Sequence, residues 1–342
     1  MTGPNRLSLA VALAAALTPA AASPADKPLL TWPDLTSRAR PAPDATVSYG
    51  DEPYQKVDVW LPKAKGLHPV VLMVHGGCWQ TSIADRGLMN WVAADLRASG
   101  YAVWNIDYRG VDRAGGGYPG TFQDVADAAD ALRTDAARFH LDTRRVVAVG
   151  HSAGGHLALW LAARPRLPAD SPLRIANPLR ITHVINLGGL PDLEATAASP
   201  DNGCGTEVVA KLTGGHLSDT SVPRLLPLGV PQELVNGRED RIIPYRMATG
   251  YVAQARKAGD HARLHTVPAT GHVELITPES AAWAETKRLI RATLNPPRDG
   301  EVARDRGRVT EGARGEGHRL RPAPSTTGPR GPAVPLPVNG EQ

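Results

Sequence analysis

The chain has 342 residues, 42% of them apolar, which fits one large globular domain and does not fit a fibre or a repeat array. Its formal net charge is +4, and half of this excess comes from residue 297 onward, where eight arginines stand against six acidic residues. Because no cluster of Lys and Arg interleaved with aromatic residues is present, nucleic-acid binding is not expected.

The N-terminal residues follow the order of a secretory signal peptide. A charged lead precedes an apolar run over 7–17 and small residues over 20–23. We expect cleavage after Ala22, hence a signal peptide over 1–22 and an exported protein, periplasmic or extracellular. The alternatives are a disordered alanine-rich N-terminus and an uncleaved anchor. A bilayer span takes about 20 apolar residues, and neither this run nor any later one is that long, so no stable membrane insertion is expected.

Strands and helices are expected to alternate along the rest of the chain. Residues 23–45 are rich in Pro and polar side chains and indicate an extended leader, with ordered structure from about residue 46. An alternating strand at 55–60, antiparallel near a sheet edge, precedes a continuously apolar central strand at 70–74. Further strands are expected at 101–106, 146–149, 181–187, 233–236 and 262–266, and helices at 84–99, 121–140, 154–163, 246–258 and 281–294.

This alternation predicts right-handed crossovers and a mainly parallel, doubly wound α/β sheet. Thr121 and Asp124 are expected to form a capping pair at the start of the helix over 121–140. The pattern weakens over 188–231, which indicates an insertion at the active-site end of the sheet. Few apolar residues follow position 295, so the domain is expected to span 46–295 and the tail over 296–342 to be disordered.

Ser152 stands in the sequence Gly-His-Ser-Ala-Gly over 150–154, between an apolar strand and a helix. That context makes the G-x-S-x-G pattern informative, because the serine of a sharp strand-to-helix turn is raised clear of the sheet. The flanking glycines let the backbone fold back on itself. The alternative is a glycine-rich connection with an ordinary serine N-cap. The turn indicates a nucleophile.

A serine nucleophile needs a base and an acid that orients the base, in the chain order Ser, acid, His. His272 follows the last predicted strand in a glycine-containing loop, which is where this arrangement presents its histidine. Asp240 follows the preceding strand and is the expected acid. Glu239, one residue away, and Asp192, after the strand ending at 187, are the competitors. Asp192 would otherwise cap the segment that follows it.

The oxyanion formed in acyl transfer needs N–H donors already aimed at it, worth roughly 3 to 4 kcal/mol each. Ala153 is expected to supply one donor from the serine turn. Gly76 or Gly77, in the sequence His75-Gly76-Gly77 directly after the strand at 70–74, is expected to supply the second. A simple turn is the alternative for these glycines. Their pairing with a serine turn one strand-helix-strand unit later favours the functional interpretation.

His75-Gly76-Gly77, the turn over 150–155, Asp240 and His272 together resemble the esterase and lipase branch of the α/β-hydrolase superfamily, across nearly all of the predicted domain. The His-Gly-Gly-x-Trp form ending at Trp79 is similar to that of kynurenine formamidase-like (arylformamidase) proteins and related carboxylesterases. It departs from the His-Gly-Gly-Gly of the hormone-sensitive-lipase-like group. The resemblance implies hydrolysis of a small-molecule carboxylic ester, or of an activated amide such as an N-formyl arylamine, and a part for Trp79 in shaping the acyl pocket.

The chain has two cysteines, Cys78 and Cys204, which is an even number. Export would bring the protein to an oxidising compartment, in which a disulfide can persist. A bridge between them is a hypothesis, and two unpaired buried thiols are the alternative. A bridge would tie the insertion over 188–231 to the oxyanion loop. No set of His, Cys and Asp residues has metal-site spacing, so neither a metal nor a cofactor is expected.

Two other functions compete with the esterase. A peptidase of the prolyl oligopeptidase type shares the serine turn and the triad order, but that family normally adds a large N-terminal β-propeller for which this chain has no room. A hydrolase-fold binding protein without catalysis usually lacks a member of the triad or of the oxyanion hole, and none is missing here. The sequence therefore favours an enzyme.

Overall fold

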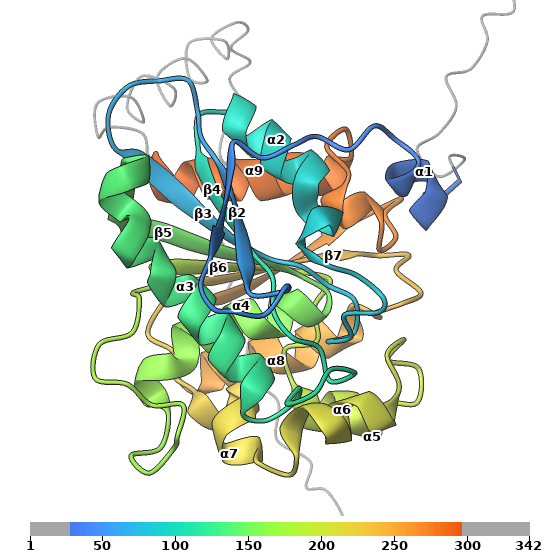
Figure 1. Ribbon diagram of the computed structural model, residues 1–342. Coiled ribbons are helices and arrows are strands. Elements are labelled where there is room, and N and C mark those ends of the chain that lie inside the picture. Colours follow the sequence, from blue (N-terminus) through green and yellow to red (C-terminus); the bar gives the residue numbers. More distant parts are fainter. Residues whose placement is uncertain (1–27, 296–342) are drawn as a thin grey trace, which may run out of the picture. The chain divides into compact units, whose positions relative to one another are not determined.

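The computed structural model describes residues 28–295 (Figure 1). The expected signal peptide over 1–22 and the expected tail over 296–342 lie outside the described residues. Between these limits the chain forms one sheet of eight strands with helices packed on its faces. This is the α/β architecture that the sequence predicts.

The strand order is β1-β2-β4-β3-β5-β6-β7-β8. The pairs β1–β2 and β2–β4 are antiparallel, and every pair from β4 to β8 is parallel. The strands are β1 (Ala45–Ser48), β2 (Lys56–Trp60), β3 (His68–Val74), β4 (Ala102–Ile106), β5 (Leu141–His151), β6 (His183–Leu187), β7 (Gln232–Gly237) and β8 (Ala262–Val267).

Helices connect the parallel strands, and a group of short helices lies between β6 and β7. Among residues 28–295, no helix combines the length with the apolar composition that a bilayer crossing needs. The helices are α1 (Trp32–Thr36), η2 (Arg86–Met89), α2 (Asn90–Ala98), α3 (Gly120–Phe139), α4 (Ala153–Ala163), η3 (Arg164–Arg166), α5 (Leu193–Ala198), α6 (Thr206–Thr213), α7 (Leu217–Thr220), η4 (Val222–Leu225), α8 (Arg246–Lys257), η5 (Glu274–Ile276) and α9 (Ala281–Leu294).

The two faces of the sheet carry separate apolar cores. Successive side chains of a strand point to opposite faces, so Val146 of β5 packs with α3, α4 and α8, whereas its neighbour Val147 packs with α2 and α9. Trp160 of α4 is fully buried in the first core, and Trp283 of α9 is fully buried in the second. Burial on both faces explains why the central strands are continuously apolar in sequence.

The expected strands and the longest helix are present close to their predicted places. β2 is antiparallel to both neighbours and second from the edge, and β3 is central, as predicted. β5 is longer than the apolar stretch at 146–149 because it begins at Leu141, beside the start of β3. The single helix expected over 84–99 is instead the 3-10 turn η2 followed by α2. The weak pattern over 188–231 corresponds to the short helices α5, α6, α7 and η4.

The expected capping pair at α3 was wrong. The helix already begins at Gly120, so Thr121 and Asp124 lie inside its first turns. The Asp124 carboxylate instead accepts hydrogen bonds from the Arg109 side chain at 2.7 and 2.9 Å and from Gln55 at 2.9 Å. An arginine held in this bidentate way fixes the loop after β4 to the helix.

The expectation that order begins near residue 46 was also wrong, because α1 lies within the supposed leader. Its start is stabilised by Asp34, whose carboxylate accepts hydrogen bonds from the N–H and the hydroxyl of Thr31, both at 2.7 Å. These bonds lower the pKa of Asp34. The Leu35 side chain is fully buried against the core that contains α2 and α9. The domain therefore includes residues upstream of β1.

His156 of α4 is an imidazole in an apolar core. Its Nε2–H donates to the Thr220 carbonyl at 2.8 Å, and the rings of Trp79 and Phe122 pack edge-on against it. Burial is the main reason why the pKa of His156 falls to about 4. The folded protein therefore holds His156 neutral over a pH range in which the unfolded chain protonates it.

We expect His156 to make the protein less stable in acid. The stability that depends on its neutral form is complete above about pH 6.5, declines as the pH falls from 6.5 to 4, and amounts to roughly 3 kcal/mol. The test compares the free energy of urea unfolding at pH 8 and pH 5 for the protein and for His156→Gln. The variant should lose less stability on acidification. Equal losses in both proteins would contradict the prediction.

Candidate active site

Ser152 occupies the turn between β5 and α4. It has the dihedral angles φ 54° and ψ −124°, a strained conformation for a residue with a side chain. The turn is so tight that a Cβ on Gly150 would lie 2.0 Å from the Gly154 carbonyl oxygen, and a Cβ on Gly154 would lie 2.2 Å from that of Val74. Only glycine fits at both places, which is the physical basis of the G-x-S-x-G pattern in this chain.

His272 and Asp240 form a buried pair at the carboxyl ends of the strands. Nδ1 of His272 lies 2.7 Å from Oδ2 of Asp240. The other oxygen of Asp240, Oδ1, accepts the backbone N–H groups of Ile242 and Ile243 at 2.9 Å. The two loops meet at Gly237, where a Cβ would lie 2.2 Å from a backbone oxygen of the histidine loop. The carboxylate is thus held on both sides, with one oxygen left for the histidine.

The two competing acids, Asp192 and Glu239, accept hydrogen bonds from backbone N–H groups of other residues. Asp192 caps α5, because one of its oxygens accepts the N–H groups of Glu194 and Ala195 at 3.0 Å. Glu239 accepts the N–H of Thr270 at 3.1 Å. The structure therefore brings Asp240, and neither competitor, to His272.

His151, the residue before the serine, packs against His272 and donates a hydrogen bond to its backbone. Its ring centroid lies 4.5 Å from that of His272, and its Nε2–H donates to the His272 carbonyl at 3.2 Å. Burial, with a smaller contribution from the neighbouring His272, lowers the pKa of His151 well below its usual value. A neutral His151 can pack against His272 without placing a positive charge beside it.

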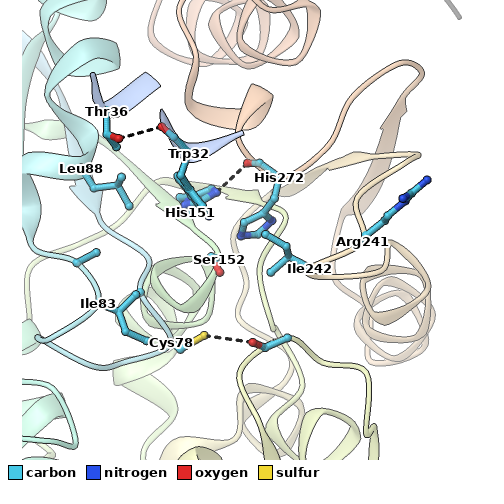
Figure 2. Close-up of a pocket in the computed structure, with 13 residues that line it drawn as sticks. Trp32, Thr36, Cys78, Ile83, Leu88, His151, Ser152, Arg241, Ile242 and His272 are labelled. Atoms are coloured by element: carbon cyan, nitrogen blue, oxygen red, sulfur yellow. Dashed lines mark hydrogen bonds between the residues drawn. The ribbon is translucent and has the colours of Figure 1, made fainter. Parts of the chain in front are cut away.

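Ser152 and His272 line the same cavity, whose volume is about 500 Å³ (Figure 2). Its walls are mostly apolar, and the exposed side chain of Arg241 at its edge points away from Ser152. Trp32, Thr36, Ile83 and Leu88 are among the lining residues that were not predicted from the sequence. The lining residues are Trp32, Thr36, Gly77, Cys78, Ile83, Ala84, Leu88, His151, Ser152, Gly203, Arg241, Ile242 and His272.

The loop after β3 brings the predicted oxyanion glycines to the serine. A Cβ on Gly76 would lie 3.0 Å from Cβ of Ser152, so the backbone of Gly76 runs directly against the nucleophile. Gly77, Cys78 and Trp79 all have positive φ angles, of 101°, 51° and 55°, which curl the loop tightly. Ala153 is the first residue of α4, where a backbone N–H has no partner within the helix. The backbone of Gly76 and the first residue of α4 therefore both lie beside Ser152.

Trp79 does not line the cavity, in contrast to the expectation from sequence. Its side chain is fully buried in the core that contains α3 and α4, with its ring edge-on to His156 at 5.8 Å. The Trp79 carbonyl accepts the N–H of Val111 at 2.7 Å, which fixes the backbone in the orientation that sends the indole inward. The next residues of the loop, including Ile83, form the cavity wall instead.

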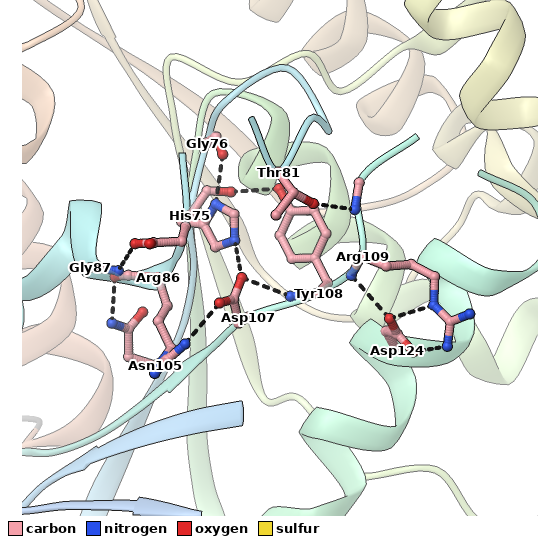
Figure 3. A network of polar contacts seen from close by, with 12 residues as sticks. His75, Gly76, Thr81, Arg86, Gly87, Asn105, Asp107, Tyr108, Arg109 and Asp124 are labelled. Carbon is pink, nitrogen blue, oxygen red and sulfur yellow. Dashed lines mark hydrogen bonds and ion pairs between the residues drawn. The ribbon is translucent and has the colours of Figure 1, made fainter. Parts of the chain in front are cut away.

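A buried polar network holds this loop from behind (Figure 3). His75 Nε2–H donates to the Asp107 carboxylate at 3.0 Å, and this carboxylate also accepts from Arg86 at 2.9 Å, while Nδ1 of His75 lies 2.7 Å from the Gly76 carbonyl oxygen. The His75 ring stacks on Tyr108, whose hydroxyl donates to the His75 carbonyl. Burial alone would raise the pKa of Asp107, but the bonds from His75 and Arg86 lower it. The ionised network stiffens the loop that presents Gly76 to Ser152.

A match to a family model identifies the family of this chain. The family model BD-FAE matches residues 57–250, more than half of the chain and a range that contains Ser152 and Asp240. The chain belongs to the BD-FAE family. The assignment to the esterase and lipase branch of the α/β-hydrolase superfamily, expected from the motifs, is confirmed.

The curated relatives of this BD-FAE chain include proteins named as esterases and an acylamino-acid-releasing enzyme. It is similar to esterase LipC of Mycobacterium tuberculosis, with 26% identity over 73% of this chain and 64% of LipC. The probable carboxylic ester hydrolase LipM of the same organism is 24% identical over 68% of this chain and 56% of LipM. The acylamino-acid-releasing enzyme of Rattus norvegicus is 27% identical over 74% of this chain and 35% of that enzyme. The chain thus spans less than two thirds of the length of each.

Solved structures share the fold. Esterase B from Lactobacillus rhamnosis superposes with a TM-score of 0.62 at 20% identity, covering 80% of this chain and 91% of the esterase. A truncated carbohydrate esterase from gut microbiota gives 0.61 at 18% identity, covering 75% of this chain and 98% of that one. At such identities the likeness concerns the fold, and it confirms the predicted α/β-hydrolase architecture.

The structure of this BD-FAE family member joins Cys78 to Cys204 by a disulfide. The bridge links the oxyanion loop to the segment between α5 and α6, and Gly203 beside it lines the cavity. In residues 28–295, no three His, Cys, Asp or Glu side chains are grouped so that they could hold a metal ion.

We expect Cys204→Ser to lower the free energy of unfolding by about 2 to 4 kcal/mol, because the bridge closes a long loop between cysteines with a sequence separation of 126. Urea unfolding with and without a reductant measures the effect. The reductant should destabilise the protein and leave Cys204→Ser unaffected. Two reactive thiols in the unreduced, unfolded protein would contradict the bridge.

Proposed function

We propose that this protein is a serine hydrolase that cleaves carboxylic esters of small molecules, with Ser152, His272 and Asp240 as its catalytic triad. The observation that carries the proposal is the His272–Asp240 pair, joined at 2.7 Å, whose histidine lines one cavity with a serine on a strained strand-to-helix turn. Membership of the BD-FAE family and relatives named as esterases support it.

In the first half of the reaction, Ser152 attacks the ester carbonyl while Nε2 of His272 takes the hydroxyl proton. Asp240 accepts Nδ1–H, which leaves Nε2 as the basic nitrogen and stabilises the imidazolium that forms. The carbonyl oxygen becomes an oxyanion, for which the N–H groups of Ala153 and of Gly76 or Gly77 are the donors. His272 then gives its proton to the departing alcohol, and an acyl-enzyme remains on Ser152.

In the second half, water attacks the acyl-enzyme. His272 takes a proton from this water, the same N–H groups stabilise the second oxyanion, and the acid leaves as Ser152 regains its proton. A cavity of about 500 Å³ is in the usual range for small-molecule sites. An activated amide such as an N-formyl arylamine would follow the same steps, so the proposed substrates include it beside carboxylic esters.

Covalent labelling tests the nucleophile. A fluorophosphonate probe should modify the protein once, and peptide mass spectrometry should locate the label on Ser152. Labelling should disappear in Ser152→Ala and after unfolding in urea, because the reaction needs the assembled triad. A label on another serine, or none, would overturn the assignment.

A panel of substrates tests the bond type. It contains p-nitrophenyl esters of graded chain length, N-formylkynurenine and aminoacyl-arylamides. We expect the esters to have the highest kcat/KM, because p-nitrophenolate leaves more readily than an amide nitrogen. Preference for the arylamides would favour the prolyl oligopeptidase-type reaction, and failure to turn over any of them would favour a binding protein.

We also propose that the protein is exported. The signal-like order of residues 1–22 and the Cys78–Cys204 disulfide, which persists in oxidising compartments, support this. Protein recovered from the periplasm or the culture medium should begin at Ser23. Protein found only in the cytoplasm, with residues 1–22 still attached, would contradict export.

A further inference from the structure

The segment around α1, residues 29–37, is a part of the site that the triad chemistry does not explain. We call it the N-terminal strap. In Figure 1, α1 (blue) lies beside the orange segment that precedes α9, which belongs to the opposite end of the chain. Buried Glu274 of η5 accepts the N–H of Leu30 from the strap and, at 3.0 Å, the N–H of Gly271 from the histidine loop. The strap is thus tied to the residue that precedes His272.

This attachment places the indole of Trp32 at the catalytic histidine. The Trp32 ring packs edge-on against His272, with centroids 6.1 Å apart, and against His151, with centroids 6.2 Å apart. Trp32 also lines the cavity that contains Ser152 (Figure 2). The indole therefore contacts the histidine on one side and the space for the substrate on the other.

The chemistry of acyl transfer decides which part of a substrate meets Trp32. The histidine must reach the leaving oxygen to protonate it, so the leaving alcohol lies on the His272 side of Ser152. The oxyanion lies on the side of Gly76, Gly77 and Ala153. Figure 2 places Trp32 next to His272, whereas Cys78 and Ile83 lie on the other side of Ser152. An ester bound in this way would have its alcohol portion at Trp32.

We propose that Trp32 is a specificity-determining residue that selects the leaving group, and that the protein prefers esters whose alcohol carries a flat or cyclic apolar group. The proposal rests on the serine-hydrolase function proposed above. An indole face offers a large, rigid contact area at little entropic cost, and flat or ring-shaped groups cover that area better than a short chain does. Binding energy gained there is specific to the alcohol and independent of the acyl group.

Two matched series of substrates separate the alcohol from the acyl group. The first contains ethyl, cyclohexylmethyl and benzyl acetates, which share one acyl group and release primary alcohols. The second contains ethyl esters from acetate to hexanoate. The proteins are the wild type, Trp32→Ala, Trp32→Phe, which keeps a smaller ring, and the control Ile83→Ala, which shortens an apolar side chain on the other side of Ser152.

We expect Trp32→Ala to lower the ratio of kcat/KM for benzyl over ethyl acetate by about tenfold, with Trp32→Phe between it and the wild type. Benzyl alcohol should inhibit the wild type as a product and inhibit Trp32→Ala less. The profile of the acyl series should be unchanged in both variants, and Ile83→Ala should leave the benzyl-to-ethyl ratio unchanged.

An equal loss for every ester in both Trp32 variants would show that Trp32 acts only through the structure, and would overturn the proposal. A changed acyl profile with a constant benzyl-to-ethyl ratio would do the same. A wild-type protein that hydrolyses no ester would instead overturn the serine-hydrolase function itself. If Trp32→Ala does not fold, the ratio measured for Trp32→Phe and the inhibition by benzyl alcohol decide the question.

Discussion

Replacing Ser152 by alanine should lower kcat for ester hydrolysis by a factor on the order of 10⁴ to 10⁶. The change removes the atom that forms the acyl-enzyme, and the methyl group of alanine fits the same strained turn without new contacts. The cavity and the N–H groups of Gly77 and Ala153 remain, so the variant should still bind substrate with a similar affinity. Initial rates on a p-nitrophenyl ester, with affinity from inhibition by a non-hydrolysable analogue, measure both quantities.

The controls for Ser152→Ala are His272→Ala and the double variant. Because the nucleophile and its base act as a unit, the double variant should be about as inactive as the worse single variant. Losses that multiply would mean that Ser152 and His272 act independently. Retention of more than a few per cent of activity in Ser152→Ala would show that another group is the nucleophile.

The motif residues were predictable because short-range geometry dictates their types. Gly150 and Gly154 are required because a Cβ at either position would lie about 2 Å from a backbone oxygen, and a position that admits only glycine is visible in the sequence. Ser152 and His272 follow strands whose apolar runs are visible, and parallel strands bring their carboxyl ends to one edge of the sheet. The order of the elements was therefore enough to bring them together.

The cavity walls were not predictable in the same way. Trp32 lies in a Pro-rich stretch, and its place depends on a half-buried hydrogen bond between Leu30 and Glu274, more than 200 residues apart in the chain. The sequence Thr-Trp-Pro-Asp did carry the signal of a capped helix start, which could have indicated α1. The prediction that Trp79 shapes the acyl pocket was wrong for a local reason. The positive φ angles over 77–79 turn its side chain away from the direction that an ordinary loop would give it.

Asp240 is the triad residue for which the sequence offered competing candidates, Asp192 and Glu239. We expect Asp240→Asn to lower kcat by about 10³- to 10⁴-fold. The reason is specific to this site. Oδ1 of Asp240 is held by the N–H groups of Ile242 and Ile243, so the asparagine must keep its oxygen there and turn its NH₂ toward His272. Nδ1 would then accept, the proton would move to Nε2, and the histidine could no longer take the proton of Ser152.

Asp192→Asn is the matched control, because it makes the same chemical change in the competing acid. Asparagine caps helices about as well as aspartate, so the start of α5 should be kept, and kcat should stay within a few-fold of the wild type. Glu239→Gln should behave likewise, since its amide oxygen can still accept the Thr270 N–H. Steady-state kinetics of the three variants on one ester distinguishes them. An active Asp240→Asn beside an inactive Asp192→Asn would mean that the catalytic loop rearranges in solution and that Asp192 orients the histidine.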